Sequence, residues 1–291
     1  GLLGARESFA KRFESPVEHA EGDSAARLQA LVSPFVLRRV TEDVVADLPE
    51  KIQDTVVAQL TGEQRKLYLA NQDRIAQQVQ HREASEFKKD KLKVLAELTK
   101  LRQICCDPHL HYADYKAGSA KLDTCMELVH GALDGGHRIL LFSQFTGMLD
   151  IIGKRLAKED IAFLKLTGAS SKESRAKMVA QFQAGEVPVF LISLKAGGVG
   201  LNLTAADVVI HYDPWWNVAA QDQATDRAHR IGQQHTVTVY KLIAKDTIEE
   251  RIMQMQESKR DLVNSVLGGD GISSALFTRE DVLALLGGDG R

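Results

Sequence analysis

The stretch R-I-L-L-F-S at residues 138–143 decides the fold class of this 291-residue chain. It is a nearly continuous apolar run, which is typical of a strand buried on both faces of a parallel sheet. A similar run, V-P-V-F-L-I-S, occupies residues 187–193. Between the two runs, helices are expected over 146–159 and 171–183, and a short strand over 163–166. Strands thus alternate with helices, which predicts an α/β fold.

The alternation continues to residue 266. We expect strands at 207–212 and 237–243 and helices at 217–230 and 246–266. This order predicts a mostly parallel sheet with helices on both faces. Ligands of such sheets bind outside the carboxyl ends of the strands. The loops that directly follow strands are therefore the places to look for a site.

The first part of the chain, to about residue 118, has a mainly helical pattern. Helices are expected at 24–33, 61–84 and 86–105, which are rich in Leu, Ala, Lys, Glu and Gln. Thr61 is an expected N-cap, and Gln64 stands three residues later in capping-box position.

The remaining upstream and terminal segments are less regular. Residues 52–60 alternate in part and are compatible with a strand, whereas 107–120 contain Pro108 and are expected to form a loop. The tail at 267–291 is expected to be flexible, with one short helix near 278–286.

Composition excludes some classes of protein. The chain is 44% hydrophobic and 26% charged, as is ordinary for a globular domain, and no apolar run is long enough to cross a bilayer. The net charge of −2 gives no global argument for nucleic acid; a local basic stretch at 85–102 is equally compatible with a solvated helix face. The three cysteines form no C-x-x-C pair, so no metal site is expected.

Residues 221–233, Q-D-Q-A-T-D-R-A-H-R-I-G-Q, carry the most informative chemistry. On the expected helix, Arg227 and Arg230 lie three residues apart and share one face. Two guanidinium groups placed this way suit the charge on a transferring phosphoryl group, as in an arginine finger. The plainer alternative is an exposed helix with a salt bridge.

Residues 193–204, S-L-K-A-G-G-V-G-L-N-L-T, follow a strand and contain Gly197, Gly198 and Gly200. Glycine permits close approach of a ligand, and successive N–H groups in such a loop can bind an anion. A tight turn is the alternative. A dinucleotide fingerprint is excluded, because the spacing is G-G-x-G and the next strand ends in His211 rather than an acidic residue.

Three further strand ends offer polar or aromatic groups. D-P-W-W-N at 213–217 places Trp215 either in the core or against a base. Ser143 and Gln144 close the first strand and are expected to face a groove, and Thr167 follows the next strand. Neither G-x-x-x-x-G-K-[ST] nor a D-E-x-[HD] box is present. A nucleotide hydrolase needs a phosphate cradle and a metal site, so the chain should supply half of an active site.

Together these stretches resemble the second RecA-like lobe of the Swi/Snf family of helicase-like, DNA-translocating ATPases in helicase superfamily two. The resemblance runs in order from about residue 30 to 266, and the sequence of the C-terminal half is more similar to bacterial members than to nuclear remodellers. Motifs IV, V and VI correspond to 139–149, 193–204 and 223–233, and the connecting and protruding regions to 33–44, 48–51 and 101–110.

The resemblance implies a division of labour. The first lobe, missing here, would hold Mg²⁺ and the phosphate cradle, and ATP would bind between the lobes. Arg227 and Arg230 would be the catalytic arginines, and Gly200 and Gln223 would join them in binding the nucleotide. Double-stranded DNA would cross both lobes, held mostly through phosphates. Its expected contacts in this chain are Ser143, Gln144, Lys195, Gly197, Gly198 and Trp215.

The resemblance also gives expected boundaries. Residues 1–118 would form the interlobe connection and helical protrusion, 119–266 the RecA-like lobe, and 267–291 the tail. We expect a monomeric fragment whose partner is the first lobe of the same parent chain, in a bacterial cytoplasm at the nucleoid, or in a nucleus. The chain departs from the usual family residues at Val218, Gln221, Thr167 and Asp107.

Two other readings stay open at this point. One is a nucleic-acid-binding module that has lost its motor activity, which those departures motivate. The other is an unrelated α/β enzyme whose glycine loop binds a nucleotide sugar or a dinucleotide.

Overall fold

The computed structural model describes most of the chain from residue 48 onward. The described residues are 6–9, 12–13, 27–28, 30–31, 48–81, 84–194, 196, 201–215, 218–256 and 279–287. Two compact units are distinguished, residues 1–47 with 254–270 and residues 48–253 with 271–291. In the first unit, a short helix α1 spans Arg6–Phe9. All of the sheet belongs to the second unit, to which the following description applies.

Six parallel strands form one sheet in the order β1-β6-β5-β2-β4-β3. The strands are β1 (Lys51–Ala58), β2 (Ile139–Ser143), β3 (Phe163–Leu166), β4 (Val189–Ser193), β5 (Val208–His211) and β6 (Val237–Ala244). In the register, Ile139 of β2 pairs with Val189 on one side and with Val208 on the other. The α/β fold with a parallel sheet is therefore confirmed.

Burial follows position in the sheet. Every residue of the central strands β2, β4 and β5 is buried, which is why these strands consist of continuous apolar runs. β1 lies at an edge, and Ile52 and Val57 on it are 41% and 48% exposed. The segment expected as a strand at 52–60 is thus part of the sheet, although it lies far upstream of the other strands.

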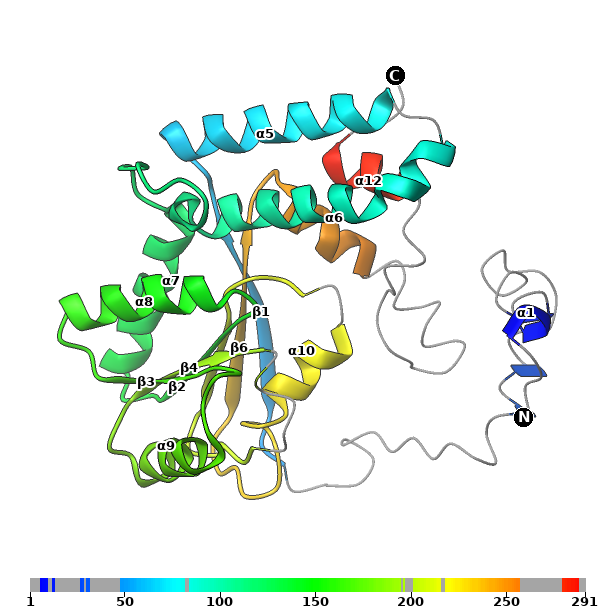
Figure 1. Cartoon of the computed structure of the whole chain (residues 1–291). Coiled ribbons are helices and arrows are strands. Elements are labelled where there is room, and N and C mark those ends of the chain that lie inside the picture. The colour runs from blue at the N-terminus through cyan, green and yellow to red at the C-terminus, as the bar shows by residue number, and fades with distance from the viewer. Residues whose placement is uncertain are drawn as a thin grey trace. The chain divides into compact units, whose positions relative to one another are not determined.

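Helices cover both faces of the sheet (Figure 1). On one face, α7 (Ala120–Asp134) and α8 (Thr146–Lys158) pack against Ile139 and Leu141. On the other face, Phe182 of α9 (Lys172–Ala184) and Ala224 of α10 (Val218–Thr225) pack among residues that include Leu140 and Phe142. Successive residues of β2 therefore serve opposite layers of the core.

A helical layer stands beyond one end of the sheet. It contains α5 (Gly62–Gln80), α6 (Ala84–Cys106) and α12 (Arg279–Leu286), which lie together in Figure 1. Gln72 on α5 donates to the carbonyl of Leu286 at 2.5 Å, so the last described helix is fastened to this layer. After α6, a short 3-10 helix, η2 (Pro108–Leu110), opens the expected loop.

Two local expectations are wrong. Thr61 is the N-cap residue of α5, but its side chain makes no capping hydrogen bond. The amide of Gln64 instead donates to the Ile104 carbonyl at 3.0 Å and accepts from the Ala120 backbone at 3.1 Å, so tertiary contacts replace the capping box. The second error concerns the arginine helix, since α10 ends at Thr225 and the residues beyond it form turns.

Other expected helices are only partly within the described residues. The segment 24–33 includes helical residues at 27–28 and 30–31, and the long helix expected at 246–266 is described as helical over 248–256. The expected helix near 278–286 is confirmed as α12. Helix α7, which covers the sheet immediately before β2, was not predicted from the sequence.

Candidate functional site: the carboxyl edge of the sheet

Three central strands end at the same edge of the sheet. β2, β4 and β5 terminate at Ser143, Ser193 and His211, and the loops after them carry most of the polar residues expected to function. α10 starts from this edge after the β5 loop, and the turns at 226–232 follow α10. The loops after β2, β4 and β5 therefore start from one edge, as expected for a parallel sheet. The arginine turn lies at the far end of α10 and is bonded to residues that precede β1 and β5.

The turns that hold the arginines are fixed from three directions. The carbonyl of Arg227 accepts a hydrogen bond from the backbone of Leu203 at 3.0 Å. Nε2 of His229, whose side chain is largely buried, lies 2.7 Å from the carbonyl of Pro49, just before β1. Gln233 donates to the Ala206 carbonyl at 2.7 Å. The two arginines are therefore presented by a braced turn and not by a continuous helix.

Arg227 has an unusual electrostatic position. The residue is only 6% exposed, and Nη1 of its guanidinium is buried with no hydrogen-bond partner among the described residues. Its Nε makes one long hydrogen bond, 3.4 Å, to the carbonyl of Gln223. Burial, and next the nearby Arg175, lower the pKa of Arg227. A buried cation beside another cation is unfavourable unless an anion joins them, so this arrangement is suited to bind one.

Arg175 was not anticipated as a site residue. It lies in the first turn of α9, and its Nη1 is 3.5 Å from the carbonyl of Ala196 in the glycine-loop segment. Its Nε is also buried without a partner among the described residues. The signal that could have revealed it is weak, since a single arginine near a helix start is common.

Two of the other expected nucleotide contacts are exposed. Arg230 and Gln223 are both exposed, and Ile231 beside them is 73% exposed. Arg227 and Arg230 thus differ sharply in environment although they are three residues apart. Gly200, Lys195, Gly197 and Gly198 lie outside the described residues.

Asp213 organises the ends of β2 and β5. It is fully buried, and its carboxylate accepts hydrogen bonds from the Ser143 hydroxyl at 2.5 Å and from the Gln144 backbone at 3.1 Å. The side-chain amide of Gln144 donates to the same carboxylate at 3.1 Å. Ser143 itself is fully buried, so the expectation that its side chain faces a groove is wrong; the hydroxyl joins two strand ends instead.

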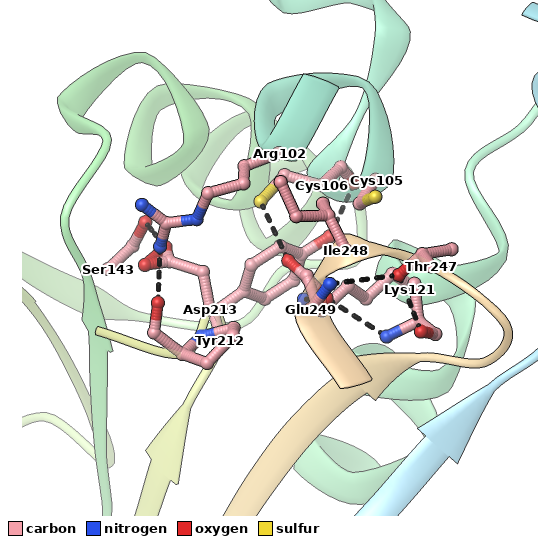
Figure 2. Close-up of polar contacts among 12 residues, drawn as sticks. Arg102, Cys105, Cys106, Lys121, Ser143, Tyr212, Asp213, Thr247, Ile248 and Glu249 are labelled. Atoms are coloured by element: carbon pink, nitrogen blue, oxygen red, sulfur yellow. Dashed lines mark hydrogen bonds and ion pairs between the residues drawn. The ribbon is translucent and has the colours of Figure 1, made fainter. Parts of the chain in front are cut away.

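Arg102 of α6 completes this cluster (Figure 2). Its guanidinium donates to Oε1 of Gln144 at 3.1 Å and to the carbonyl of Pro214. The guanidinium carbon also lies 5.6 Å from the centre of the Phe145 ring. Its partners are 42 and 112 residues away in the chain, so no local pattern could have identified its role.

Trp215 is partly buried and packs against the core on the α9–α10 face. Its backbone N–H lies 3.4 Å from Oε1 of Gln221 on α10. One of the two tryptophans is thus at least in part a packing residue, as the plainer reading held. Gln221, one of the departures from the family pattern, accepts this bond through an oxygen that a glutamate would also provide.

A second charged cluster lies deeper, where α7 meets the helical residues at 248–253 (Figure 2). Nζ of Lys121 lies 2.5 Å from Oε2 of Glu249, and both side chains are fully buried. Glu249 also accepts from the Ala244 backbone at 2.9 Å, and Lys121 lies 5.3 Å from the centre of the Tyr212 ring. Glu249 raises the pKa of Lys121 against the opposing effect of burial. This pair is a satisfied structural contact.

The cysteines belong to the same interior. Cys105, Cys106 and Cys125 are free and buried, and burial raises the pKa of Cys125 to about 12. They are therefore unreactive thiols at neutral pH. Among the described residues no group of three His, Cys, Asp or Glu side chains is arranged to hold a metal ion. Within the same part of the chain, no helix is long and apolar enough to cross a membrane.

Comparison with known proteins gives the family. Residues 120–232 match the helicase conserved C-terminal domain, and residues 1–110 match the SNF2-related domain. A solved SWI2/SNF2 ATPase C-terminal domain from Sulfolobus solfataricus is 32% identical, with a TM-score of 0.66 over 81% of this chain and 98% of that domain. The chain belongs to the SWI2/SNF2 family.

Another solved structure shows a larger part of this machinery. The Sulfolobus solfataricus SWI2/SNF2 ATPase core in complex with double-stranded DNA is 35% identical, with a TM-score of 0.69. The alignment covers 98% of this chain and 61% of that core. The RecA-like α/β fold expected from the sequence is therefore shown for this SWI2/SNF2 chain.

Curated relatives are named as ATP-dependent helicases. An uncharacterized ATP-dependent helicase of Mycoplasma pneumoniae is 38% identical over 98% of this chain, and the putative helicase/translocase YwqA of Bacillus subtilis is 38% identical over 96%. The chain spans only 27% and 31% of the lengths of these two proteins. It therefore carries part of a SNF2-family, helicase-like ATPase.

Proposed function

We propose that this chain is the second motor lobe of an ATP-dependent double-stranded-DNA translocase. In this proposal residues 119–266 form the lobe, 1–118 the connection and helical protrusion, and 267–291 a tail. The first lobe would lie upstream in the full-length protein and would supply the phosphate cradle and the Mg²⁺ ligands.

The buried guanidinium of Arg227 is the observation that carries the proposal. Among the described residues its Nη1 has no hydrogen-bond partner, and Arg175 is a second cation nearby whose Nε also has none. Both cations are compatible with an anionic group bound beside them, and ATP would supply that group as its terminal phosphate. In that role Arg227 would offset the negative charge that develops during phosphoryl transfer.

Arg230 would act from the exposed side of the same turn. Its side chain and that of Ile231 are exposed in this chain, as expected of residues that meet a second lobe. Gln223 and Gly200 would complete the nucleotide contacts from α10 and the glycine loop. The braced turn described above would hold these groups in place when the lobes close.

The DNA contacts would come from the loops at the carboxyl edge of the sheet. Lys195, Gly197 and Gly198 remain proposed contacts to the phosphate backbone, because glycine-loop N–H groups and a lysine suit phosphate oxygens. The side-chain amide of Gln144 already accepts from Arg102 and donates to Asp213. Gln144 would therefore contribute by shaping the loop that faces the DNA. The named complex of the Sulfolobus core with double-stranded DNA supports duplex DNA as the partner.

ATP turnover with and without duplex DNA tests the proposal. The full-length protein should hydrolyse ATP and should be strongly stimulated by duplex DNA, whereas this chain alone should hydrolyse almost none. Turnover by the isolated chain close to that of the full-length protein would contradict the proposal. Duplex binding without turnover in the full-length protein would instead indicate a nucleic-acid-binding module, and tight binding of a nucleotide sugar without DNA affinity an unrelated enzyme.

A further inference from the structure

Arg102 makes hydrogen bonds to loops outside the helical layer, which the packing of α6 within that layer does not require. The residue is 1% exposed, although it is an arginine on a helix whose other described basic residues are at least partly exposed. Its guanidinium reaches two separate loops, one after β2 through Gln144 and one after β5 through Pro214. One buried cation thus joins the helical layer to both strand ends.

The two loops are already joined to each other without Arg102. Asp213 accepts from the Ser143 hydroxyl and from the backbone and side chain of Gln144. These bonds make the two strand ends one rigid unit. Arg102 adds the connection from that unit to α6, and its fork of donors allows both loops to be held at once.

The unit continues into α10 and toward Arg227. Directly after Pro214, the backbone of Trp215 approaches Gln221 of α10 at 3.4 Å. At the far end of that helix, Nε2 of His211 lies 2.8 Å from the Thr225 hydroxyl, two residues before Arg227. A contiguous series of bonds thus runs from α6 through the strand ends to the arginine turn.

We propose that Arg102 is a positioning residue that transmits movement of the helical layer on α6 to the arginine turn. This rests on the proposed function, in which α6 belongs to the connection and helical protrusion of a DNA-stimulated motor. Duplex DNA that engages the helical layer would shift α6, and Arg102 would carry that shift to the loop before α10. Its effect is on the stimulation by DNA and not on the chemistry itself.

The test compares Arg102→Met with Arg74→Met in the full-length protein. Arg74 pairs with Glu97 at the half-exposed α5–α6 contact, so its replacement removes an arginine contact to α6 without reaching the strand ends. Arg102→Met should lower duplex-stimulated ATP turnover at least 10-fold while basal turnover stays within 2-fold. Arg74→Met should leave both within 2-fold. Arg102→Lys, which can reach one of the two loops, should recover part of the stimulation.

Equal loss of basal and stimulated turnover in Arg102→Met, or unchanged stimulation, would overturn the proposal. If Arg102→Met does not fold, Arg102→Lys serves in its place, because its ammonium group can reach only one of the two loops that Arg102 holds. It should lower stimulation at least 3-fold, and unchanged stimulation would again overturn the proposal.

Amide hydrogen exchange separates this inference from the proposed function. In Arg102→Met, exchange at residues 211–227 should rise at least 10-fold over wild type, with no rise in Arg74→Met. If the wild-type protein shows no ATP turnover at all, the proposed function fails, and this exchange difference alone decides the role of Arg102. Absence of the difference would overturn it.

Discussion

Two buried cations in this molecule have opposite surroundings. Lys121 is fully buried and paired with the equally buried Glu249, which also accepts a backbone hydrogen bond. Arg227 is buried after α10, its Nη1 has no hydrogen-bond partner among the described residues, and Arg175 is a neighbouring cation. Removing a charged group from water costs several kcal/mol, which is on the order of the net stability of a whole domain. A buried charge without a counterion therefore points to a role in binding a ligand and not in stabilising the fold. Lys121 is thus a structural contact, whereas Arg227 is a candidate binding residue.

The largest effect on stability is expected at the paired cation. Lys121→Met leaves the Glu249 carboxylate buried without its counterion, and the free energy of unfolding should fall by about 3–5 kcal/mol. Guanidinium unfolding of the variant and wild type measures it. The double variant Lys121→Met with Glu249→Leu should recover a large part of the loss.

A matched surface pair provides the control for this prediction. Lys165 pairs with Asp150, and their side chains are 39% and 51% exposed. Lys165→Met should therefore cost no more than about 1 kcal/mol. Similar costs for the Lys121 and Lys165 variants would show that the buried pair is not the structural contact described here.

An intermediate effect is expected from pH at the end of β5. Burial, and next Lys241, lower the pKa of His211 to about 3 from an ordinary value of 6.5. The unfolded chain then binds the proton more readily, so stability is lost as pH falls from 6.5 toward 3, by up to about 1.4 kcal/mol per unit. His211→Phe should remove this contribution in unfolding curves measured from pH 7 to pH 4. Identical slopes for the two proteins would mean that His211 titrates normally.

The smallest effect distinguishes two helix starts. The Ser119 hydroxyl caps α7, two residues before Lys121, accepting from the Leu122 backbone at 3.3 Å and donating to the Cys106 carbonyl at 2.8 Å. Ser119→Ala should cost about 1–2 kcal/mol. Thr61→Ala should cost no more than a few tenths, because its hydroxyl makes no cap bond. Thermal unfolding of the two variants side by side measures the difference, and equal costs would contradict it.

The strands and most helices could be predicted because burial determines the local pattern of apolar residues. The runs at 138–143 and 187–193 are apolar throughout since both faces of the central strands are covered. The place of β1 at the sheet edge was not predictable, because its partner β6 lies about 180 residues away and its exposed residues lack a buried pattern. Chain topology, not local preference, sets that pairing.

The candidate site was predicted in composition but not in geometry. The arginine turn was expected as helix, yet bonds from Leu203 and to Pro49 hold residues 226–232 in turns. Arg227 was identified from its motif, whereas only the structure shows that it is buried and that its Nη1 has no hydrogen-bond partner among the described residues. Arg102 lies in the segment 101–110 that resembles the family, but its contacts could not be predicted, since both partners are distant along the chain.

The most direct test of the central claim measures turnover and stability in one variant, Arg227→Ala. If the unpaired guanidinium serves phosphoryl transfer, duplex-stimulated ATP turnover of the full-length protein should fall on the order of 10³-fold or more. The free energy of unfolding should change by less than about 1 kcal/mol or rise, because no bond to a buried anion is lost. A variant that keeps turnover within tenfold of wild type, or that loses stability as Lys121→Met does, would contradict the account.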